Sequence, residues 1–502
     1  MQFTEISFAI FLTVVFSLYW LVLRRSVKVQ NLLLLGASYL FYGWWDWRFL
    51  GLIMLTTFTT FVTALGATSR YGRLLTAANI VVNLGILVAF KYFNFFAENL
   101  GRLFDLVGWN LDRFTIDVLL PVGISFYTFQ AIAYSVDVYK HRVKASYDPV
   151  AFATFIAYFP QLVAGPIERA SQLLSQISAL RRWDSGYASS GLRMILYGVL
   201  KKVCVADMLA LYVDRLYSGG LDTPVHVLAA GVLFSVQIYC DFSAYSEIAR
   251  GVSRLLGIEL MANFRFPYFS RNILEFWRRW HISLMYWFRD YLYIPLGGNR
   301  KGNVRTAFNT VAVFLLSGLW HGAAWNFIAW GAYWAIVYVA GKQLLHFKRR
   351  DNAVSFRDLP DMILTFGAVA FGFYIFRCDT WSQLVAGCMN AWVYISAFGL
   401  MWCVAKMLCT YRLARIAAMV LCGVMGIVAV MWIIPRWPLL LKAWWLLPGI
   451  LALCVEWRSR NMEYALERIS PSPWKRLIFY WACIAMIVVS EPVDMTFIYF
   501  QF

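Results

Sequence analysis

Residues 307–327, AFNTVAVFLLSGLWHGAAWNF, decide the fold class of this chain. The stretch contains no Asp, Glu, Lys or Arg and is long enough to cross the roughly 30 Å hydrocarbon core of a bilayer as a helix. Its one ionisable group is His321. An ionisable side chain at membrane depth is costly, so it usually lines a cavity or takes part in chemistry. The stretch therefore predicts a membrane protein with a functional group inside the bilayer.

Similar apolar runs recur along the whole chain, which is 61% hydrophobic and only 14% charged. This composition excludes a soluble globular domain. We predict an all-α polytopic membrane protein with about 11–14 transmembrane helices, and short interfacial or re-entrant helices around a central cavity. No polar stretch is long enough for a separate domain, so residues 1–502 are expected to form one membrane-embedded domain. The candidate spans are 6–23, 31–45, 49–68, 75–96, 118–138, 150–165, 191–213, 227–248, 307–327, 328–346, 361–377, 383–408, 416–434, 439–456 and 476–490.

The net charge of +18 is distributed in short clusters between these spans. Arg24 and Arg25 follow the first span, Arg70 and Arg73 follow the third, and Lys140 follows the fifth. The positive-inside rule makes these loops cytoplasmic and places the N-terminus outside. The first span is then an anchor, because a cleaved signal peptide carries its positive charge ahead of the apolar region. We therefore expect the lipid bilayer as a partner and no nucleic acid.

The densest polar segment of the chain is 264–305. Its eight Arg and Lys residues stand against only two acidic residues, Glu275 and Asp290, and many aromatic residues lie between them. This mixture predicts short helices that lie in, or dip into, the cytoplasmic interface. The glycines of PLGGNRKGN at 295–303 predict a turn-rich loop.

Two histidines are the main candidates for chemistry. His321 lies in GLWHGAAW at 318–325, where small residues let helices pack closely beside the imidazole. It is interpreted either as a general base that removes a proton from a hydroxyl, or as a packing histidine bonded to a neighbouring carbonyl.

His281 lies in EFWRRWHISL at 275–284 and is interpreted either as a catalytic partner or as an interfacial histidine in a solvated basic face. If this stretch is helical, Arg278 shares a face with His281, and Glu275 can pair with Arg278 or Arg279. The two histidines are too far apart for one helix, so neighbouring elements would have to bring them to one cavity. No HExxH motif or Cys/His cluster accompanies them, and we expect no metal site.

Asp241 in QIYCDFSAYSEI at 237–248 is a further buried polar candidate. A hydrogen-bonded structural role and a proton-handling role both remain open for it. The nine cysteines form no CxxC pair and are interpreted as packing residues. The chain has no Walker, GxGxxG or GxSxG pattern, which gives no support to nucleotide binding or to a serine nucleophile elbow.

Several motifs together resemble the membrane-bound O-acyltransferase family, and within it the bacterial branch that O-acetylates alginate. They are LPVGISFYTFQAIAYSVDVYKH at 120–141, YFPQLVAGPIERASQLL at 158–174, GLRMILYGVLKKVCVADML at 191–209, QIYCDFSAYSEIARGVSRLLGIEL at 237–260, NFRFPYFSRNILEFWRRWHISLMYWFRDYLYIPLGGNR at 263–300, FLLSGLWHGAAWNF at 314–327 and FIYFQF at 497–502. The resemblance runs nearly end to end and in order. PLGGNR and FIYFQF favour the alginate-type branch.

The resemblance implies a catalytic core at about 118–346, in which His321 matches the near-invariant catalytic histidine. His281 matches the second polar position, which is asparagine in many eukaryotic relatives. One departure concerns WGAYWAI at 330–336, where Trp334 occupies a position at which alginate-type members often carry another histidine.

The resemblance also implies the reaction. A thioester donor, acetyl-CoA or an acyl carrier protein, would approach from the cytoplasm as a substrate, with no cofactor bound. The donor side would include Arg278, Arg279, Arg289 and Trp280, because basic side chains attract phosphates and acidic carriers. The acyl group, acetyl above all, would cross the bacterial inner membrane for O-acetylation of a periplasmic or extracellular polysaccharide such as alginate. A periplasmic SGNH-like partner would complete the transfer.

Other functions remain open at this point. The acyl group could instead be D-alanyl, and the acceptor a cell-wall polymer, a lipid or a protein. A transporter or channel is the alternative from another class, since intramembrane charges suit it too, but the inverted repeats that would favour it are absent from the sequence. A structural scaffold is the third possibility.

Overall fold

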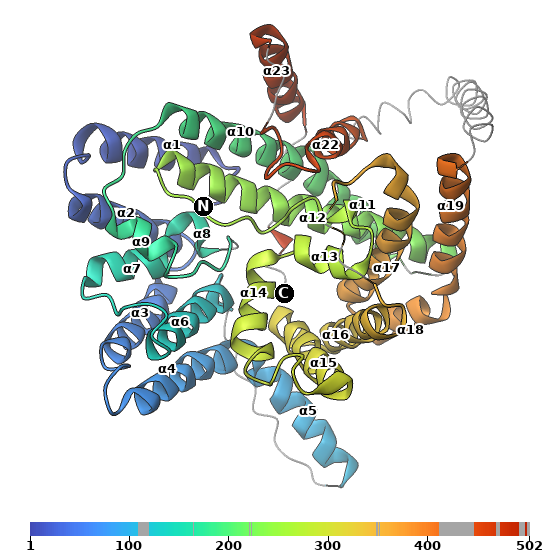
Figure 1. Cartoon of the computed structure of the whole chain (residues 1–502), viewed down its shortest axis with the longest axis horizontal. Helices are drawn as coiled ribbons and strands as arrows, with labels where there is room; N and C mark the ends of the chain where they lie inside the picture. The colour runs from blue at the N-terminus through green and yellow to red at the C-terminus, as the bar shows by residue number, and fades with distance from the viewer. Residues whose placement is uncertain are drawn as a thin grey trace.

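The computed structural model describes residues 1–108, 120–163, 165–219, 221, 223–347, 350, 352–410, 446–467, 472–490 and 497–498, and every regular element in these residues is a helix. Figure 1 shows them as a broad assembly with the termini near the middle. One side is built by α1 (Ile6–Ser17), α2 (Val27–Gly43), α3 (Leu50–Leu65), α4 (Gly72–Leu87), α6 (Ile124–Tyr139), α7 (Pro149–Ala157), α8 (Phe159–Leu162) and α9 (Leu173–Ser178).

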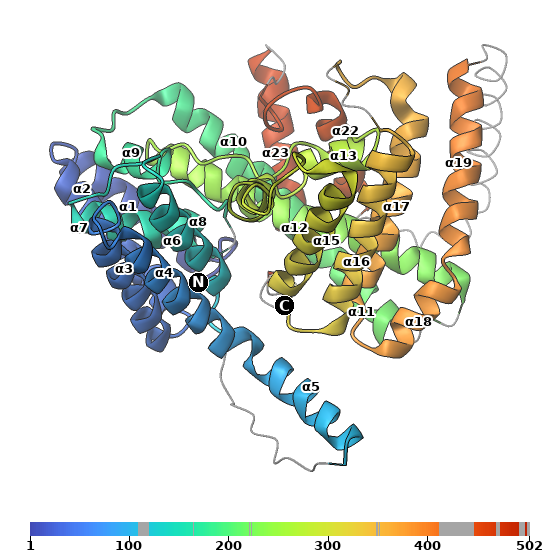
Figure 2. The same cartoon turned by 60° about the horizontal axis from the view of Figure 1, so that its bottom comes forward.

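Long helices cross the middle of the assembly and cover its other side. The centre holds α10 (Ser185–Lys201), α11 (Asp207–Ser218), α12 (Pro224–Leu255) and the short α13 (Ile273–Arg279) and α14 (Ile282–Phe288). Beside them lie α15 (Gly302–His321), α16 (Trp325–Val339), α17 (Leu359–Arg377), α18 (Trp381–Met389) and α19 (Trp392–Thr410). The outlying helices are α5 (Phe93–Leu106), α22 (Leu446–Ser459) and α23 (Pro473–Val489), and α5 projects away from the body (Figure 2).

Short 3-10 and π turns join or interrupt these helices. They are η1 (Leu18–Val22), η2 (Trp47–Phe49), η3 (Val88–Tyr92), η4 (Lys202–Ala206), η5 (Pro267–Phe269), η6 (Arg289–Tyr293), η7 (Ala340–Leu344) and η8 (Phe356–Asp358). Such turns shift the face that a helix presents and often mark functional positions. Through η3, the helices α4 and α5 form one bent rod.

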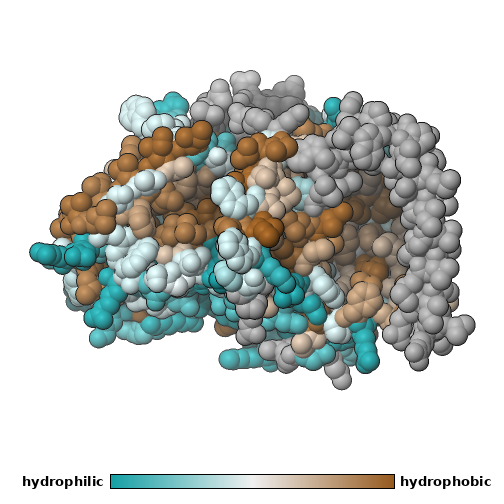
Figure 3. Space-filling view, turned by 90° about the horizontal axis from the view of Figure 1, so that it is seen from above, coloured by the Kyte–Doolittle hydropathy of each residue, from teal (hydrophilic) through white to brown (hydrophobic). Residues whose placement is uncertain are grey.

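The surface of the assembly suits a bilayer. Figure 3 shows a broad apolar band across one face with polar side chains below it. Large apolar side chains such as Ile6, Leu21 and Ile395 are more than 75% exposed, which is stable only against lipid. Among the described residues, five helices are long and apolar enough to cross a membrane: Trp47–Leu65, Gly72–Leu106, Pro224–Leu255, Phe356–Arg377 and Trp392–Cys409.

The prediction of an all-α polytopic membrane protein is therefore confirmed, while the number of 11–14 spans stays a prediction. Most predicted spans coincide with one helix or with two joined helices. The predicted span 383–408 is divided between α18 and α19, and the span 191–213 is interrupted by η4. The span 416–434 and the first part of 439–456 lie outside the described residues.

The condition under which Arg278 and His281 would share a helix face is not met. The stretch 275–284 is not a continuous helix, because α13 ends at Arg279 and His281 adopts a left-handed conformation with φ of 44°. The chain turns there, so His281 and Arg278 do not share a helix face. The ion pair between Glu275 and Arg279 does form, at 2.6 Å.

Glycines bring α15 and α16 into close contact near His321. A Cβ atom on Gly318 would lie 2.1 Å from the carbonyl oxygen of Phe327, and one on Gly331 would lie 2.5 Å from that of Phe314. No larger residue fits at either position without moving backbone. The close helix packing expected from GLWHGAAW is therefore present.

Lys201, a charged residue in the middle of the predicted span 191–213, has charged and polar partners inside the protein. The Nζ atom of Lys201 lies 2.9 Å from a carboxylate oxygen of Glu247 and 3.6 Å from one of Glu456, and it donates to the hydroxyl of Ser243 at 2.7 Å. These contacts tie α10 to α12 and α22. A buried charge is tolerated only when it is paired in this way.

Candidate active site

His321 is the last residue of α15, and the chain leaves the helix at Gly322, whose backbone is extended. The imidazole is 7% exposed, and its ring lies 4.8 Å from Trp320, 5.1 Å from Trp330 and 5.2 Å from Phe376 between ring centres. Beside it lies a cavity of about 50 Å³, here named the histidine cavity. Its lining is Lys91, Leu120, Pro121, Val122, Gly123, Ile124, Ser125, Phe126, Val163, Trp320 and His321.

His281 approaches the same region from the turn between α13 and α14. It is 1% exposed, and its ring centre lies 4.8 Å from Phe242 and 5.9 Å from Trp320. Both histidines therefore pack against the indole of Trp320. A non-glycine residue in the left-handed region is strained, and such strain gathers at functional sites. The two histidines thus share a packing partner, but His281 is not among the residues that line the histidine cavity, so their meeting at one cavity and their catalytic roles stay predictions.

Two adjoining hollows of about 390 and 370 Å³ lie on the other side of α14. Both are lined by Arg278, Ile282, Tyr286 and Arg289, and together they are named the arginine groove. One part is mainly apolar, with Trp277, Met285, Phe288, Val313 and Phe314 among its lining residues. The other part is charged and includes Arg169, Arg250, Glu259, Arg265 and Glu463.

Charges in the arginine groove are only partly paired. Arg289 pairs with Asp290 at 2.6 Å, and Arg169 contacts the same carboxylate. Burial alone would raise the pKa of Asp290, but hydrogen bonds from these two arginines outweigh it and hold the pKa below the usual range. The guanidinium groups of Arg265 and Arg278 enter no ion pair or side-chain hydrogen bond within the described ranges, so they remain available for an anionic ligand.

The other two residues expected on the donor side lie elsewhere. Arg279 pairs with Glu275, and Trp280 is 4% exposed, with its ring 5.0 Å from Phe264 and 4.9 Å from Phe373. Neither lines the arginine groove. Their geometry supports an ion-pair and a packing role, and their contact with a donor stays a prediction.

Only a short distance along α15 separates the groove from the cavity. Phe314 lines the groove and His321 lines the cavity, so the two are about 10 Å apart along the helix axis. His281 lines neither the groove nor the cavity, although the next residue, Ile282, lines the groove.

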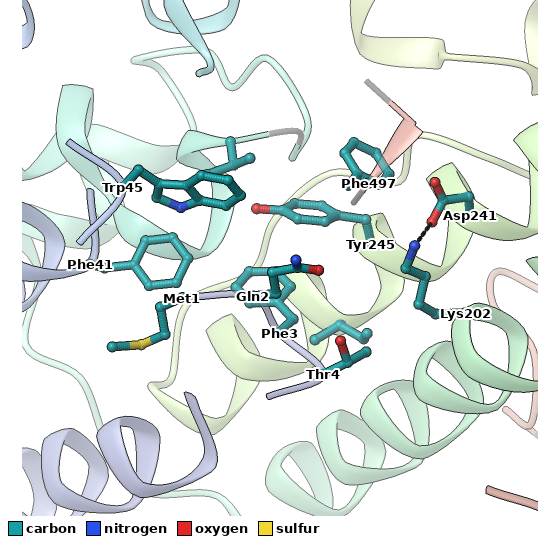
Figure 4. Close-up of a pocket in the computed structure, with 12 residues that line it drawn as sticks. Met1, Gln2, Phe3, Thr4, Phe41, Trp45, Lys202, Asp241, Tyr245 and Phe497 are labelled. Atoms are coloured by element: carbon teal, nitrogen blue, oxygen red, sulfur yellow. Dashed lines mark ion pairs between the residues drawn. The ribbon is translucent and has the colours of Figure 1, made fainter. Parts of the chain in front are cut away.

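Asp241 has a structural environment. Its carboxylate pairs with Lys202 at 2.9 Å and accepts a hydrogen bond of 2.7 Å from the backbone amide of Ile498. Figure 4 shows this pair beside Tyr245, with Phe497 lying over the same pocket. The geometry favours the hydrogen-bonded structural interpretation, in which Asp241 anchors the C-terminal segment.

Two charged residues, Lys91 and Glu168, were not selected from the sequence as site residues. Lys91 lines the histidine cavity. The one sequence signal that could have identified it is its position as an isolated charge in the apolar run 75–96, which is a general sign of a functional intramembrane residue. Glu168 is 1% exposed and accepts a hydrogen bond of 2.6 Å from the amide of Met261. Its buried position could not be read from a loop sequence.

Trp334 occupies the position at which alginate-type members often carry another histidine. Its indole is completely buried, and its ring centre lies 5.0 Å from that of Trp277 and 5.7 Å from that of Phe276. It supports the wall of the groove and offers no proton-accepting group. Within the described ranges, no three His, Cys, Asp or Glu side chains gather closely enough to hold a metal ion.

Comparison with known proteins places this site in a family. Residues 142–378 match the family model described as membrane-bound O-acyltransferase, MBOAT. The probable alginate O-acetylase AlgI of Azotobacter vinelandii is 38% identical over 376 residues, which cover 74% of this chain and 73% of the relative. The peptidoglycan O-acetyltransferase of Helicobacter pylori is 32% identical, over 70% of this chain and 72% of the relative. The teichoic acid D-alanyltransferase of Bacillus subtilis is 29% identical, over 51% and 68%.

These matches confirm the resemblance seen in the sequence motifs. The matched region includes His281, the arginine groove residues Arg265 and Arg278, and His321. The identity to the alginate-type relative extends over nearly three quarters of both chains. The chain belongs to the membrane-bound O-acyltransferase family and is an O-acyltransferase of the membrane.

Proposed function

We propose that the protein passes an acetyl group from a cytoplasmic thioester donor across the bacterial inner membrane, for O-acetylation of a periplasmic or extracellular polysaccharide such as alginate. The observation that carries this proposal is the position of His321 beside a small cavity, on the same helix, α15, that lines a wide cationic groove about two turns earlier. The names of the relatives, two of which refer to O-acetylation, support the same reaction.

The arginine groove is assigned to the cytoplasmic side. It lies in the basic segment 264–305, and positive charge concentrates in cytoplasmic loops. Both candidate donors, acetyl-CoA and an acetylated carrier protein, present phosphate next to a long flexible arm. A guanidinium binds phosphate through two parallel hydrogen bonds, which suits the unpaired Arg265 and Arg278. The apolar part of the groove, near Met285 and Phe314, would take the arm.

The reaction needs one proton acceptor. The neutral imidazole of His321 takes the proton of an acceptor hydroxyl, and the hydroxyl oxygen attacks the thioester carbonyl. The C–O bond forms, the C–S bond breaks, and the leaving thiolate receives the proton back from His321. General base catalysis of this kind contributes about 10²–10⁴ in rate. His281, in the turn between α13 and α14, orients the donor or polarises its carbonyl.

The size of the histidine cavity supports a small acyl group. A cavity of about 50 Å³ is much smaller than the roughly 300–1,000 Å³ of a typical ligand pocket. Acetyl suits this space better than a fatty acyl chain does, which disfavours long-chain lipid acylation. D-alanyl transfer remains the second candidate, because the relative from Bacillus subtilis is a teichoic acid D-alanyltransferase. The transporter and scaffold interpretations gain no support from the family match.

A polysaccharide is too large for the histidine cavity, so an intermediate carrier is needed. We therefore propose a periplasmic partner with an SGNH-like serine site, which would take the acetyl group at the outer face and complete the transfer. Acyl carrier protein would be a second partner only if it, and not acetyl-CoA, is the donor.

The test compares His321→Ala with wild type in the native cell, at matched protein level in the membrane. We expect the O-acetyl content of the extracellular polysaccharide, measured by NMR, to fall at least about 100-fold. His226→Ala is the matched control, because His226 is exposed in the first turn of α12 and remote in sequence from both histidines of the site. Unchanged O-acetylation in His321→Ala would falsify the proposal.

The donor is identified separately. Membranes that contain the protein are incubated with [¹⁴C]acetyl-CoA or with [¹⁴C]acetyl carrier protein. Label on the polysaccharide from only one of the two identifies the donor. Label on lipid alone contradicts the polysaccharide proposal.

A further inference from the structure

Lys91 lines the histidine cavity beside His321, although it comes from a distant part of the chain. It lies in η3, the π turn that joins α4 to α5. A π turn adds one residue to the helix and rotates the residues that follow it. Here the turn directs Lys91 and the neighbouring Tyr92 toward the end of α15, some 230 residues later.

These two side chains complete the hydrogen bonding of α15. The last four carbonyl groups of any helix lack a partner within the helix. In α15 the first of the four, on Gly318, accepts a weak bond of 3.4 Å from the amide of Gly322. The next, on Leu319, accepts from the hydroxyl of Tyr92 at 2.9 Å. The last two, on Trp320 and His321, accept from Nζ of Lys91 at 2.8 and 2.9 Å.

No ordinary helix cap could replace this arrangement. Gly322 leaves α15 with an extended backbone, so the chain does not fold back over its own carbonyl groups. It enters α16 at Trp325, only a few residues later. Without the ammonium group, the carbonyls of Trp320 and His321 would lose the two hydrogen bonds that Lys91 donates to them in a buried region.

The charge of Lys91 matches this position. A helix ends with a partial negative charge, which stabilises a cation there. Lys91 forms no ion pair with a carboxylate in the part of the chain that the structure describes, so its hydrogen-bond acceptors there are the two carbonyl groups. A hydrogen bond from an ammonium group is stronger than one between neutral groups.

We infer that Lys91 is a positioning residue for His321: its ammonium group fixes the backbone of Trp320 and His321 and thereby aims the imidazole into the histidine cavity. The inference rests on the proposed function, because it takes His321 as the working base. Tyr92 assists at the preceding carbonyl. The role belongs to the acceptor side of the reaction, since neither residue lines the arginine groove.

A positioning role differs from a purely structural one in what it changes. A base that is displaced by about 1 Å can lose about 100-fold in rate while the substrate still binds. Removal of Lys91 should therefore lower kcat and leave KM for the donor unchanged. A lysine needed only for folding would lower the amount of folded protein and leave kcat per folded molecule the same.

The experiment measures acetyl transfer in membrane vesicles over a range of donor concentrations, with rates divided by folded protein from size-exclusion chromatography in detergent. Lys91→Met keeps the length of the chain without the charge, and we expect kcat to fall about 100-fold at unchanged donor KM. Lys91→Arg restores the charge and should recover most of the rate. Tyr92→Phe removes one neutral hydrogen bond and should have a smaller effect. Lys140→Met, in an exposed loop, is the matched control.

Two results would overturn the inference: Lys91→Met with the wild-type kcat, or a raised donor KM at unchanged kcat. If Lys91→Met does not fold, Lys91→Leu, which likewise has neither an N–H donor nor a charge in its side chain, replaces it under the same criteria. His321→Ala is measured in parallel. An active His321→Ala contradicts the proposed function itself, whereas an inactive His321→Ala with an active Lys91→Met contradicts only the role of Lys91.

Discussion

The arginine groove and the histidine cavity are both lined by residues of α15, but they differ in size and charge. The groove has two parts of about 390 and 370 Å³ and is lined by five arginines, two of them unpaired within the described residues. The cavity has about 50 Å³, and among the described residues Lys91 and His321 are the ionisable groups that line it. The groove is thus suited to hold a large anionic donor, and the cavity to admit only a small group.

This difference follows from how each is built. The groove lies along α13 and α14, which are seven residues each and are separated by the turn at His281, so they leave space between longer helices. The cavity lies between the end of α15 and residues 120–126, which include the start of α6, and a Cβ atom on Gly123 there would lie 2.4 Å from the carbonyl oxygen of Leu162. Short interrupted helices therefore provide binding surface, and close backbone packing at Gly123 accompanies the small cavity.

The largest expected effect comes from filling the cavity. Val163 is 2% exposed and lines the histidine cavity, so Val163→Phe places a phenyl ring where the acetyl group would pass. We expect the rate of acetyl transfer to fall at least about 100-fold, because a substrate that cannot reach the base cannot react. Binding of the donor to the groove, measured by equilibrium dialysis with labelled donor, should change less than about 2-fold.

Val163→Ala is the control for this substitution, since it enlarges the cavity and should keep transfer within a few fold of wild type. Thermal melting in detergent checks that Val163→Phe is folded. Full activity of a folded Val163→Phe would show that the acyl group takes another route.

The helical architecture and the histidine pair could be predicted from sequence, because both depend on local signals. An apolar run longer than a bilayer core predicts a helix, and an ionisable group such as His321 inside it predicts function. Lys91 carries the same local signal, but its partners, the carbonyls of Trp320 and His321, lie 229 and 230 residues away. Only the three-dimensional structure identifies what such a lysine contacts.

The segment 264–305 shows a second limit of prediction from the sequence. Its composition correctly predicted short helices, while their interfacial position stays a prediction, and it could not separate Arg278, which lines the groove, from Arg279, which pairs with Glu275. Adjacent residues on a helix point in different directions, and the end of α13 at Arg279 changes the direction again. The left-handed turn at His281 has no sequence signal, because such turns usually carry glycine or asparagine.

The second largest predicted effect is weaker binding of the donor when positive charge is removed from the arginine groove. The double substitution Arg265→Gln with Arg278→Gln removes the two unpaired guanidinium groups and keeps polar side chains. We expect KM for the donor to rise about 10-fold at unchanged kcat, because charge-assisted hydrogen bonds to phosphate are lost. Added salt should raise the KM of wild type toward that of the variant, since ions screen exposed charges.

Arg300→Gln is the matched control, because Arg300 is exposed and outside the groove. A fall in kcat instead of a rise in KM would place these arginines in the chemical step and contradict the division between a binding groove and a reaction cavity.

The smallest predicted effect is a loss of stability on removal of the Glu259 carboxylate, which lines the arginine groove. Burial raises the pKa of Glu259, but hydrogen bonds from Arg254 and the charge of Arg250 outweigh it and hold the pKa below the usual range. The ionised carboxylate therefore stabilises the fold above the unfolded pKa of 4.5, and this contribution is lost as the pH falls through the lowered folded value. Because Glu259 is 34% exposed, solvent screening limits the contribution to about 1 kcal/mol or less.

Glu259→Gln should lower the melting temperature in detergent by a few degrees at pH 7, and the difference in melting temperature from wild type should narrow as the pH is lowered below 4.5. A difference that is constant down to pH 4 would show that the ion pairs with Arg250 and Arg254 do not hold this part of the groove, and that packing alone keeps the groove open.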